Sequence, residues 1–530
     1  MSYHACLFEA KSIQSYLFSS GRMPDVIGAS ELLDSLTGPL LDAALSALRL
    51  VEGTDILFSR RAGGAFQAYA DEASITQFHA LWTLLVQQYA PGLAYDIALG
   101  EGATALDAFD AARQALRADT SRHRPRLPAA APIVDRHRRT GQAVEFIDDH
   151  DGRIDAATAR KKAFVRRGSS GFIERFSPPN AALGRDDWPR DLTPGGRDAF
   201  PYLGDDHTVA LIHADGNGLG QLLMNVRTAA SNAPERFIGL FRTLSEGITQ
   251  CTVEAARTAT AQVLVPVRQV NKPLAARPIL LGGDDLTILV RADLAMDFLR
   301  AFIEAFEAQS QKVLKDLTDQ GVGDLPERLT VGAGLVYLRH SQPFYLASRL
   351  AESLMAQAKR RAKQFDPACP PSSMAFHRVT ASLIDDAEAI VTNERSHRDG
   401  DITYVDTLGC YFLGHGTHGP RLDDLIALRD LLSGDDMARG PTRQLLTLIG
   451  QAPAQARQRY RRWRQLMKDQ RKARLDEFDQ HLKTLLDTEP DSTLPYAGQG
   501  STRATPLGDA LALLGAGSTP QQETEQESAA

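Results

Sequence analysis

Three aspartates stand beside strongly apolar stretches, where their carboxylates can act together. Asp215 follows the apolar run at residues 208–213, and Asp284 and Asp285 lie inside the apolar stretch 278–290. Adjacent carboxylates between buried strands are costly unless their charge is paired or binds a metal ion. If the two segments pair in one sheet, the three carboxylates converge at one edge. Such oxygen ligands can hold two Mg²⁺ or Mn²⁺ ions about 4 Å apart for phosphoryl transfer.

Glycines flank these aspartates and favour contact with phosphate groups. Gly282 and Gly283 permit a sharp turn and allow phosphates to approach backbone N–H groups. Gly216 and Gly218, with Asn217 between them, would do the same beside the first aspartate. We therefore expect a site in which carboxylates hold metal ions and glycine-rich turns face the phosphates of a nucleotide.

Two common nucleotide-binding motifs do not fit. The string at residues 215–220 has its glycines in the order GxGxG rather than GxGxxG, which disfavours a dinucleotide-binding fold. The sequence also contains no GxxxxGK[ST] string, so a P-loop is excluded.

The secondary-structure signals form an internal repeat. In the first copy we predict, in chain order, a strand at 4–9, a helix at 29–50, a hairpin with strands at 55–61 and 65–69, a helix at 74–89, a strand at 93–99 and a helix at 105–118. In the second copy we predict a strand at 208–213, helices to about 261, a hairpin at 278–290, a helix at 294–317, a strand at 329–336, a helix at 344–363 and a strand at 374–379. The order is the same in both, as in a duplicated domain.

The first copy keeps the glycine turn but lacks the chemistry of the second. Aligned on the glycine pairs, Ala65 and Phe66 take the place of the two adjacent aspartates. In the closing helix, Leu116 takes the place of Lys359. We therefore expect one competent copy and one degenerate copy.

The composition is that of an ordinary globular protein of several domains. The chain has 530 residues, 43% of them hydrophobic, and 59 basic against 66 acidic side chains for a formal charge of −7. No apolar run is long enough to span a membrane and no secretory signal is present, so we expect a cytoplasmic protein without a membrane partner. The four cysteines lie far apart, which excludes a CxxC zinc ribbon.

Two further features have a structural and a functional interpretation. His213 lies inside an apolar run and is expected to be a hydrogen-bonded core residue rather than a ligand. The basic segment 457–474, which includes Tyr460 and Trp463, is typical of a solvated helix face, with contact to RNA or a partner as the alternative.

Several strings together resemble the large subunit of type III CRISPR effector complexes. They are FEAKSIQSYLFSSGRMPDVIGASELLD near the N-terminus, LIHADGNGLG and LLGGDDLTILV around the aspartates, and LASRLAESLMAQAKRRAK with SSMAFHRV. The resemblance covers residues 1–120 and 205–380. It implies an α+β fold with two ferredoxin-like palm domains, the second carrying a GGDD cyclase site, and an α-helical C-terminal domain.

The resemblance also implies roles for individual residues. Asp215, Asp284 and Asp285 would be catalytic metal ligands. The backbone of Gly216 and of Gly283 would face metal or phosphate. Lys359 would contact the triphosphate.

From the repeat and the resemblance we divide the chain into five parts. These are a degenerate first palm at residues 1–120, a connecting segment at 121–204, a second palm with the GGDD site at 205–380, a helical C-terminal domain at 381–516 and a disordered tail at 517–530.

The sequence departs from the family pattern at two places. Family members often begin with an HD nuclease domain, whereas this sequence starts at the first palm, so we expect no HD nuclease. Its only His-Asp pair, His150-Asp151, is expected to form a turn. The segment 135–141 resembles the family's zinc region without its cysteines, so we expect the structural zinc to be lost.

These observations predict a nucleotidyl cyclase that uses two Mg²⁺ or Mn²⁺ ions and converts ATP to cyclic oligoadenylates when target RNA is recognised. Its partners would be the other effector subunits, guide RNA and target RNA. Two alternatives stay open: a free-standing defence or GGDEF-like dinucleotide cyclase, and a non-catalytic scaffold subunit that binds RNA and protein.

Overall fold

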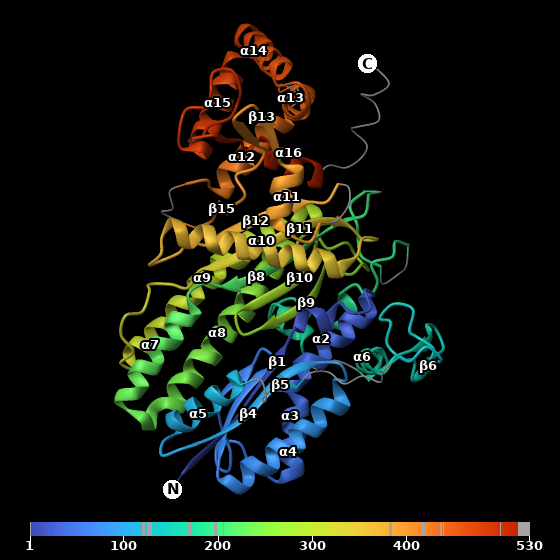
Figure 1. Cartoon of the computed structure of the whole chain (residues 1–530), viewed down its shortest axis with the longest axis vertical. Coiled ribbons are helices and arrows are strands. Elements are labelled where there is room, and N and C mark those ends of the chain that lie inside the picture. Colours follow the sequence, from blue (N-terminus) through green and yellow to red (C-terminus); the bar gives the residue numbers. More distant parts are fainter. Residues whose placement is uncertain are drawn as a thin grey trace.

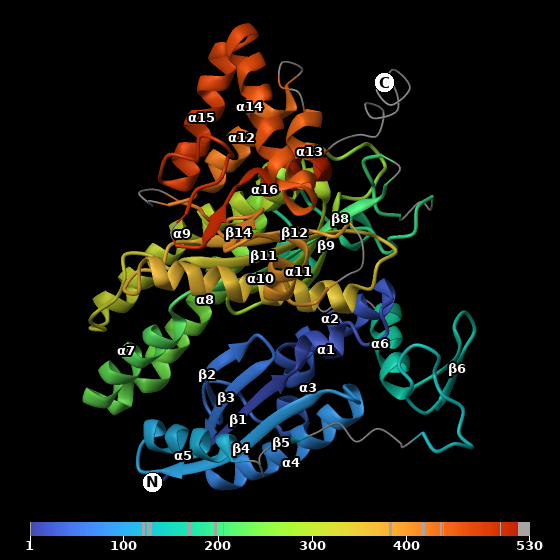
Figure 2. The same ribbon diagram turned by 45° about the horizontal axis from the view of Figure 1, so that its top comes forward.

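The computed structural model describes residues 2–118, 122–123, 130–167, 171–195, 199–204, 206–380, 384–414, 419–434, 437, 439–498 and 500–517. The predicted disordered tail lies outside the described residues, except for its first residue. Figures 1 and 2 show the N-terminal sheet domain at one end, a second sheet domain in the middle and a group of helices at the other end.

The first domain is a ferredoxin-like palm. Its antiparallel sheet has the strand order β2-β3-β1-β4-β5. The strands are β1 (Tyr3–Lys11), β2 (Leu57–Ala62), β3 (Ala65–Ala70), β4 (Ala94–Gly102) and β5 (Arg122–His123). The helices are α1 (Ile13–Leu17), α2 (Met23–Thr37), α3 (Pro39–Leu48), α4 (Glu72–Tyr89) and α5 (Ala105–Arg117). The central position of β1 between β3 and β4 is the arrangement of the predicted fold.

The single helix predicted at residues 29–50 is wrong. The structure divides it into α2, which begins earlier at Met23, and α3, which begins at Pro39. Between them Gly38 leaves the helical conformation, with φ −120° and ψ −121°. Proline has no N–H to continue the helical hydrogen bonds and its ring clashes with the preceding turn, so the helix must restart there.

The second domain repeats this topology in a sheet of order β15-β12-β11-β8-β10-β9. The strands are β8 (Thr208–Gly216), β9 (Ala276–Gly282), β10 (Asp285–Arg291), β11 (Val331–Arg339), β12 (Ser373–Arg378) and β15 (Tyr411–Phe412). The helices are α7 (Leu219–Asn232), α8 (Phe237–Ala259), which continues as a π-helical turn at Thr260–Leu264, α9 (Ala295–Asp319) and α10 (Phe344–Phe365). The predicted strands and helices of this copy are confirmed to within a few residues at their ends.

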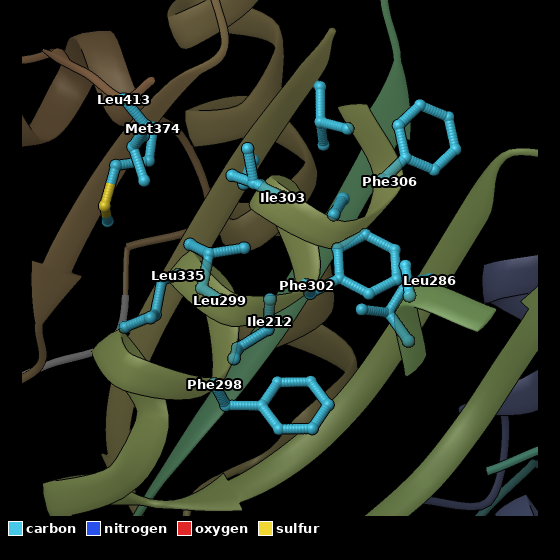
Figure 3. Packing of buried hydrophobic residues seen from close by; sticks show 14 of the residues in the cluster. Ile212, Leu286, Phe298, Leu299, Phe302, Ile303, Phe306, Leu335, Met374 and Leu413 are labelled. Atoms are coloured by element: carbon cyan, nitrogen blue, oxygen red, sulfur yellow. The ribbon is translucent and has the colours of Figure 1, made fainter. Parts of the chain in front are cut away.

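A continuous apolar core fixes this second sheet. One face of the sheet presents Ile212 from β8 and Leu335 from β11, and α9 packs Phe298 and Phe302 against them (Figure 3). All four side chains are buried. Large, close-packed side chains on this face of the sheet therefore hold in place the strands that end at the predicted site.

The connecting segment has more structure than predicted. It contains β6 (Phe146–Asp148), β7 (Gly152–Ile154), α6 (Ala156–Arg167) and two 3₁₀ turns, Ile173–Phe176 and Arg185–Asp187. α6 packs against α2, and at Gly28 a Cβ atom would lie 2.0 Å from the carbonyl oxygen of Lys161. The buried Lys161 ammonium donates to the carbonyl oxygen of Tyr16 and to Ser19 Oγ. α6 is thus anchored to the first palm.

Hydrogen bonds stabilise the part of this segment that resembles the family's zinc region. His137 Nδ1 lies 2.6 Å from Asp155 Oδ2, which also accepts from Thr140 Oγ1 at 2.7 Å. The His150-Asp151 pair lies in the β6–β7 turn, as predicted, and Asp151 pairs with Lys162.

The C-terminal part combines helices with a small sheet. Its elements are α11 (Ala387–Glu394), β13 (Ser396–Asp399), β14 (Ile402–Val405), α12 (Leu422–Ser433), α13 (Arg439–Gln451), α14 (Pro453–Gln470), α15 (Lys472–Leu486), β16 (Thr502–Ala504) and α16 (Leu507–Gly517). The sheet order is β13-β14-β16. The helices form the group at the end of the molecule away from the first palm (Figure 1).

The basic segment 457–474 lies mostly on α14. Tyr460 and Trp463 are buried and pack inward, with the Trp463 ring 5.2 Å from that of Phe478. Arg464 forms an ion pair with Asp479 of α15. The aromatic residues of this segment therefore belong to the helical core, and the exposed face of α14 carries basic side chains without them.

Across the described residues, every helix is too short or too polar to cross a membrane.

Candidate metal and nucleotide site

The pairing of three strands brings the predicted aspartates together. β10 pairs with β8 in antiparallel register, with Leu286 opposite Ala214. Asp285 begins β10 opposite Gly282, and Asp284 lies in the two-residue turn before it. This register places the end of β8, with Asp215, beside the start of β10. The condition under which the three carboxylates were expected to converge, the pairing of the hairpin with the Asp215 strand, is therefore met.

The three carboxylates form a compact group. One oxygen from each of Asp215, Asp284 and Asp285 lies within 4.8 Å of the others. Among the described residues, no other set of three or more histidine, cysteine or acidic side chains is close enough to share a metal ion. Clustered hard oxygen donors are the ligands that Mg²⁺ and Mn²⁺ prefer, so the group fits the divalent ions expected from the sequence.

The protonation of the group reflects the crowding of its charges. Burial, the hydrogen bond with Asp215 and repulsion by its charge raise the pKa of Asp284 to about 7. Reduced solvation and repulsion by both neighbours also raise the pKa of Asp285 well above its usual range. Burial opposes ionisation of Asp215, but its hydrogen bond with Asp284 and the charge of Lys359 outweigh burial and lower its pKa. A divalent cation would favour the ionised form of all three.

Lys359 of α10 reaches the group from the side of β11. Its ammonium donates a hydrogen bond to Asp215 Oδ2 and a second one, 2.9 Å long, to the carbonyl oxygen of Gly216. A Cβ atom at Gly332 of β11 would lie 2.3 Å from Lys359 Cγ, so only glycine leaves room for this side chain. The structure thus brings Lys359 to the aspartates, although its hydrogen bonds here are to protein groups.

The predicted glycines have distinct positions. Gly283 adopts φ +61° in the turn and its carbonyl oxygen accepts a 2.6 Å hydrogen bond from Thr252 of α8. A Cβ atom at Gly216 would lie 3.2 Å from Asp284 Oδ2. Gly218 caps α7 with φ +76° and faces open space. Gly218 and Gly283 therefore have open space beside their Cα atoms, whereas Gly216 is buried against Asp284.

Asn217 is directed to a structural contact. Its backbone N–H donates to the carbonyl oxygen of Thr330 at 2.8 Å, and its buried side-chain amide donates to Thr330 Oγ1 at 3.0 Å. The side chain therefore ties the turn after β8 to the start of β11. The nucleotide-binding role predicted for Asn217 remains a prediction, for which this side chain would have to give up that contact.

The residues of the first hairpin correspond to those of the second hairpin in a different way from the one predicted. Its hairpin pairs Ala62 with Ala65, as Gly282 pairs with Asp285. Ala65, rather than Phe66, is thus the structural counterpart of Asp285, and Gly64 is the counterpart of Asp284. The alignment on the glycine pairs is off by one residue because strand pairing, not the glycine string, sets the turn.

The same register reveals an acid that sequence reasoning missed. Glu9 of β1 pairs with Ala65, which makes Glu9 the counterpart of Asp215. Glu9 forms an ion pair with Lys11, whose ammonium also lies 3.7 Å from Asp96. Asp96 pairs with Glu9 across the sheet, at the position that Gly332 occupies in the second palm. The first palm therefore keeps the strand acid without the two turn acids.

A cleft of about 620 Å³ lies between the two palms and reaches Gly283 and Asp284. The first palm contributes basic side chains to it from three different elements. They are Lys11, Arg60, Arg113 and Arg117. Sequence reasoning missed these residues because no motif links them and only the facing of the two domains brings them together.

The two palms meet at their glycine turns. A Cβ atom at Gly282 would lie 3.0 Å from Gly63 Cα, so the backbones of the two hairpins touch. A side chain at Gly282 would press against the Gly63 turn, and one at Gly63, where φ is +62°, would strain that turn.

His213 is a core histidine, as predicted. It is buried, and burial lowers its pKa to about 4. Its ring nitrogens lie within 3.5 Å of polar atoms of Gln14, Thr287 and Ser348.

Comparisons with known proteins were made for sequence and for structure. Residues 208–365 match the family model described as Cas10/Cmr2, second palm domain. A search of curated proteins gives no match.

Several solved structures are similar at low identity. The Csm1–Csm4 cassette in complex with cA4 shares 14% identity at a TM-score of 0.46, over 88% of this chain and 64% of that chain. The Csm1–Csm4 cassette in complex with AMPPNP shares 12% at 0.48, over 97% and 70%. Csm1 from T. onnurineus shares 13% at 0.49, over 97% and 69%. The chain thus spans just under two thirds of the first of these proteins.

The family match covers the strands that carry the three aspartates and the helix that carries Lys359. It confirms the resemblance predicted from the sequence to the large subunit of type III CRISPR complexes. Residues 208–365 are thus similar to the second palm domain of Cas10/Cmr2 proteins.

Proposed function

We propose that this chain is a metal-dependent nucleotidyl cyclase that joins ATP into cyclic oligoadenylates. The observation that carries the proposal is the group of three carboxylates at the strand ends of the second palm, with Lys359 beside them and, in front, a large cleft to which the first palm contributes three arginines. In each step the 3′-oxygen of one nucleotide bonds to the α-phosphorus of another. The bond from that phosphorus to the bridging oxygen breaks, pyrophosphate leaves and the hydroxyl proton is released.

Asp215, Asp284 and Asp285 would hold two Mg²⁺ or Mn²⁺ ions. When bound, the ions would lower the pKa of the attacking hydroxyl and neutralise charge on the triphosphate. The Gly283 turn, held by Thr252, leaves space for phosphate next to the carboxylates. Lys359 keeps Asp215 ionised and oriented, and its ammonium would offset triphosphate charge once a cation takes over Asp215.

The first palm would orient the second nucleotide. Its residues Arg60, Arg113 and Arg117 line the same cleft as Asp284, from the opposite side. Guanidinium groups bind phosphate by paired N–H donors. The degenerate turn of the first palm lacks its own acid pair, so this domain would bind and position a nucleotide without activating it.

We further propose that the chain acts in the cytoplasm as the large subunit of a type III CRISPR effector complex. Its partners would be the other effector subunits, guide RNA and target RNA, and target RNA would switch the cyclase on. The family match of the second palm supports this assignment.

The experiment assembles the chain with its effector subunits and guide RNA, adds target RNA, Mg²⁺ or Mn²⁺ and each of the four nucleoside triphosphates, and identifies products by mass spectrometry. We expect cyclic oligoadenylates from ATP, and none from the Asp284→Ala/Asp285→Ala variant. Cyclic dinucleotides from GTP would favour a GGDEF-like cyclase. No product from the assembled, target-bound complex would favour a scaffold, and product from the double variant would contradict the site.

A further inference from the structure

A second cavity of about 620 Å³ lies where three parts of the molecule meet. α2 of the first palm contributes Ile27, the connecting segment contributes Arg185 and Arg190, and β9 of the second palm contributes Arg277. Figure 1 shows α2 next to both α6 and β9 at this junction. The cavity shares no lining residue with the cleft between the palms, so it is separate from the aspartate site.

Arg277 is the unusual member of this cavity. Its side chain is only 2% exposed, and burial lowers its pKa to about 9. Nη1 reaches the carbonyl oxygen of Pro189 at 3.5 Å, while the buried Nε has no hydrogen-bond partner among the described residues. An arginine is costly to bury unless its donors are satisfied. An oxygen-rich ligand in the cavity would satisfy them.

Glu31 of α2 does not fill that role. It is fully buried, yet neither carboxylate oxygen accepts a hydrogen bond from the described residues. Its nearest ionic contact is Arg185 Nη2, at 3.9 Å. Burial raises its pKa, against the influence of Arg185 and Arg277. Glu31 therefore compensates only part of the charge of the arginines around it.

The other two arginines also line the cavity, and each has a protein partner. Arg185 donates to the carbonyl oxygen of Val165, and Arg190 pairs with Asp186 on the open side, where its side chain is 45% exposed. Among the described residues that line the cavity, the acidic one is Asp191, which accepts from the backbone N–H of Thr193. These described lining residues include three guanidinium groups and one carboxylate, and Glu31 and Asp186 beside them offset part of the excess positive charge.

We propose that this cavity binds the phosphate groups of a small molecule, either a nucleotide or free pyrophosphate. Three guanidinium groups, two from the connecting segment and one from β9, provide more N–H donors than a single carboxylate ligand would use. The apolar side chains of Ile27 and Val165 on the remaining wall leave room for a nucleoside.

A bound phosphate would tie the connecting segment to the second palm. Arg277 lies on β9, the strand that ends at Gly282 directly before the two aspartates. α2 already holds this strand, because Ser30 Oγ donates to the carbonyl oxygen of Ile279. A ligand held by Arg277, Arg185 and Arg190 would add a link between β9 and the connecting segment. We therefore expect ligand binding to slow hydrogen exchange along β9.

The test measures binding of inorganic pyrophosphate and of ADP to the full chain by isothermal titration calorimetry in buffer with EDTA. EDTA removes the divalent cations that would hold a polyphosphate at the three aspartates, and Arg113→Glu reports any binding that remains in the cleft between the palms. We expect one site per chain. Arg190→Glu should weaken it at least about tenfold, as should Arg277→Gln. Arg349→Glu, which breaks a comparably exposed ion pair with Asp385, should leave binding unchanged.

The outcomes separate the possible ligands and sites. ADP binding at least about tenfold tighter than pyrophosphate identifies a nucleotide, and equal binding identifies free phosphate chemistry. No binding, or equal binding by wild type and both pocket variants, overturns the proposal and leaves the arginines as structural ion pairs. Loss of binding only in Arg113→Glu would place the anion in the cleft between the palms. If Arg277→Gln unfolds, Arg190→Glu, at an exposed side chain, keeps the test decisive.

Discussion

The two palms have the same topology but place different side chains at equivalent positions. The second palm has Asp215, Asp284 and Asp285 at its strand ends, whereas the first has Glu9, Gly64 and Ala65. Both turns use a glycine with positive φ, so the backbone is preserved. The difference teaches that a cluster of three carboxylates is a small addition to this fold, because only two side chains at the hairpin separate the second palm from the first.

The cation beside each acid also differs in origin. In the second palm Lys359 comes from a helix and crosses the space left by Gly332. In the first palm Lys11 comes from the same strand as Glu9, and Asp96 occupies the place of Gly332. The lysine of the first palm pairs with an acid on its own strand. The lysine of the second palm reaches its acid from a helix, which leaves the end of the strand open to a ligand.

The strongest test of this comparison replaces each of two acids at matching positions by its amide, in separate variants. Asp215→Asn should lower oligoadenylate synthesis at least about 100-fold, because even the loss of groups outside a metal's own ligands typically costs 10- to 100-fold. Glu9→Gln, at the counterpart position, should lower it less than about tenfold. The rates are measured by mass spectrometry with the assembled complex. Equal losses would show that both palms take part in the chemistry.

The next test removes the cation of the second palm. Lys359→Met keeps the packing of the aliphatic side chain over Gly332 and removes the charge beside Asp215, so we expect an approximately 10- to 100-fold loss of activity. Arg360→Met is the matched control, because Arg360 is the next residue of α10 and pairs only with Glu388 at the surface. A similar loss in both variants would point to helix stability rather than to the ammonium group.

A third test follows the protonation of the aspartates. The pKa of Asp284 is raised to about 7 in the folded, metal-free chain, whereas in the unfolded chain it is near 4. Between these two pH values the folded chain therefore holds a proton that the unfolded chain has released. This contribution to stability is present at low pH and is lost as the pH rises through about 7. Mg²⁺ should relieve that loss, so it should raise the thermal midpoint by a few degrees at about pH 8 and by less at about pH 5.5.

The Asp284→Ala/Asp285→Ala variant is the control for that measurement. It should show little change with Mg²⁺ at either pH. The same midpoint shift in wild type and variant would place the cation elsewhere in the molecule.

The smallest effect is expected in the first palm. Lys11→Met removes an ion pair whose side chains are 37% and 46% exposed, and pairs of this kind contribute about 0–1 kcal/mol. The free energy of unfolding, measured in guanidinium chloride, should therefore change by less than about 1 kcal/mol. A larger loss would mean that the Glu9–Lys11–Asp96 group has a structural role that its second-palm counterpart lacks.

Local signals in the sequence were sufficient for the strands that carry the aspartates. The apolar runs before Asp215 and on both sides of the glycine pair predicted β8, β9 and β10, whereas the pairing of β10 with β8 was only a condition for the site and is supplied by the structure. The break at Gly38-Pro39 was missed because leucines continue at helical spacing on both sides of it. Periodicity indicates a helical face and does not show where the chain turns.

The rest of the site depends on pairing and on domain contacts. Glu9 was missed because only the register of β1 with β3 identifies it as the counterpart of Asp215. The basic residues of the cleft come from β1, β2 and α5, and no local pattern distinguishes them from ordinary surface arginines. The contact of Asn217 with Thr330 joins positions more than a hundred residues apart.

The backbone contact between Gly63 and Gly282 makes the geometry of the aspartates a shared property of both palms. Without the first palm, the second palm would therefore lose the surface against which its glycine turn packs. For the same reason, the geometry of the aspartate site depends on the degenerate first palm. The turn of the first palm carries no acidic side chain, and its role at this contact is to fix the shape of the neighbouring turn. A substitution at Gly63 would therefore disturb the aspartate site, although Gly63 contributes no chemical group to that site.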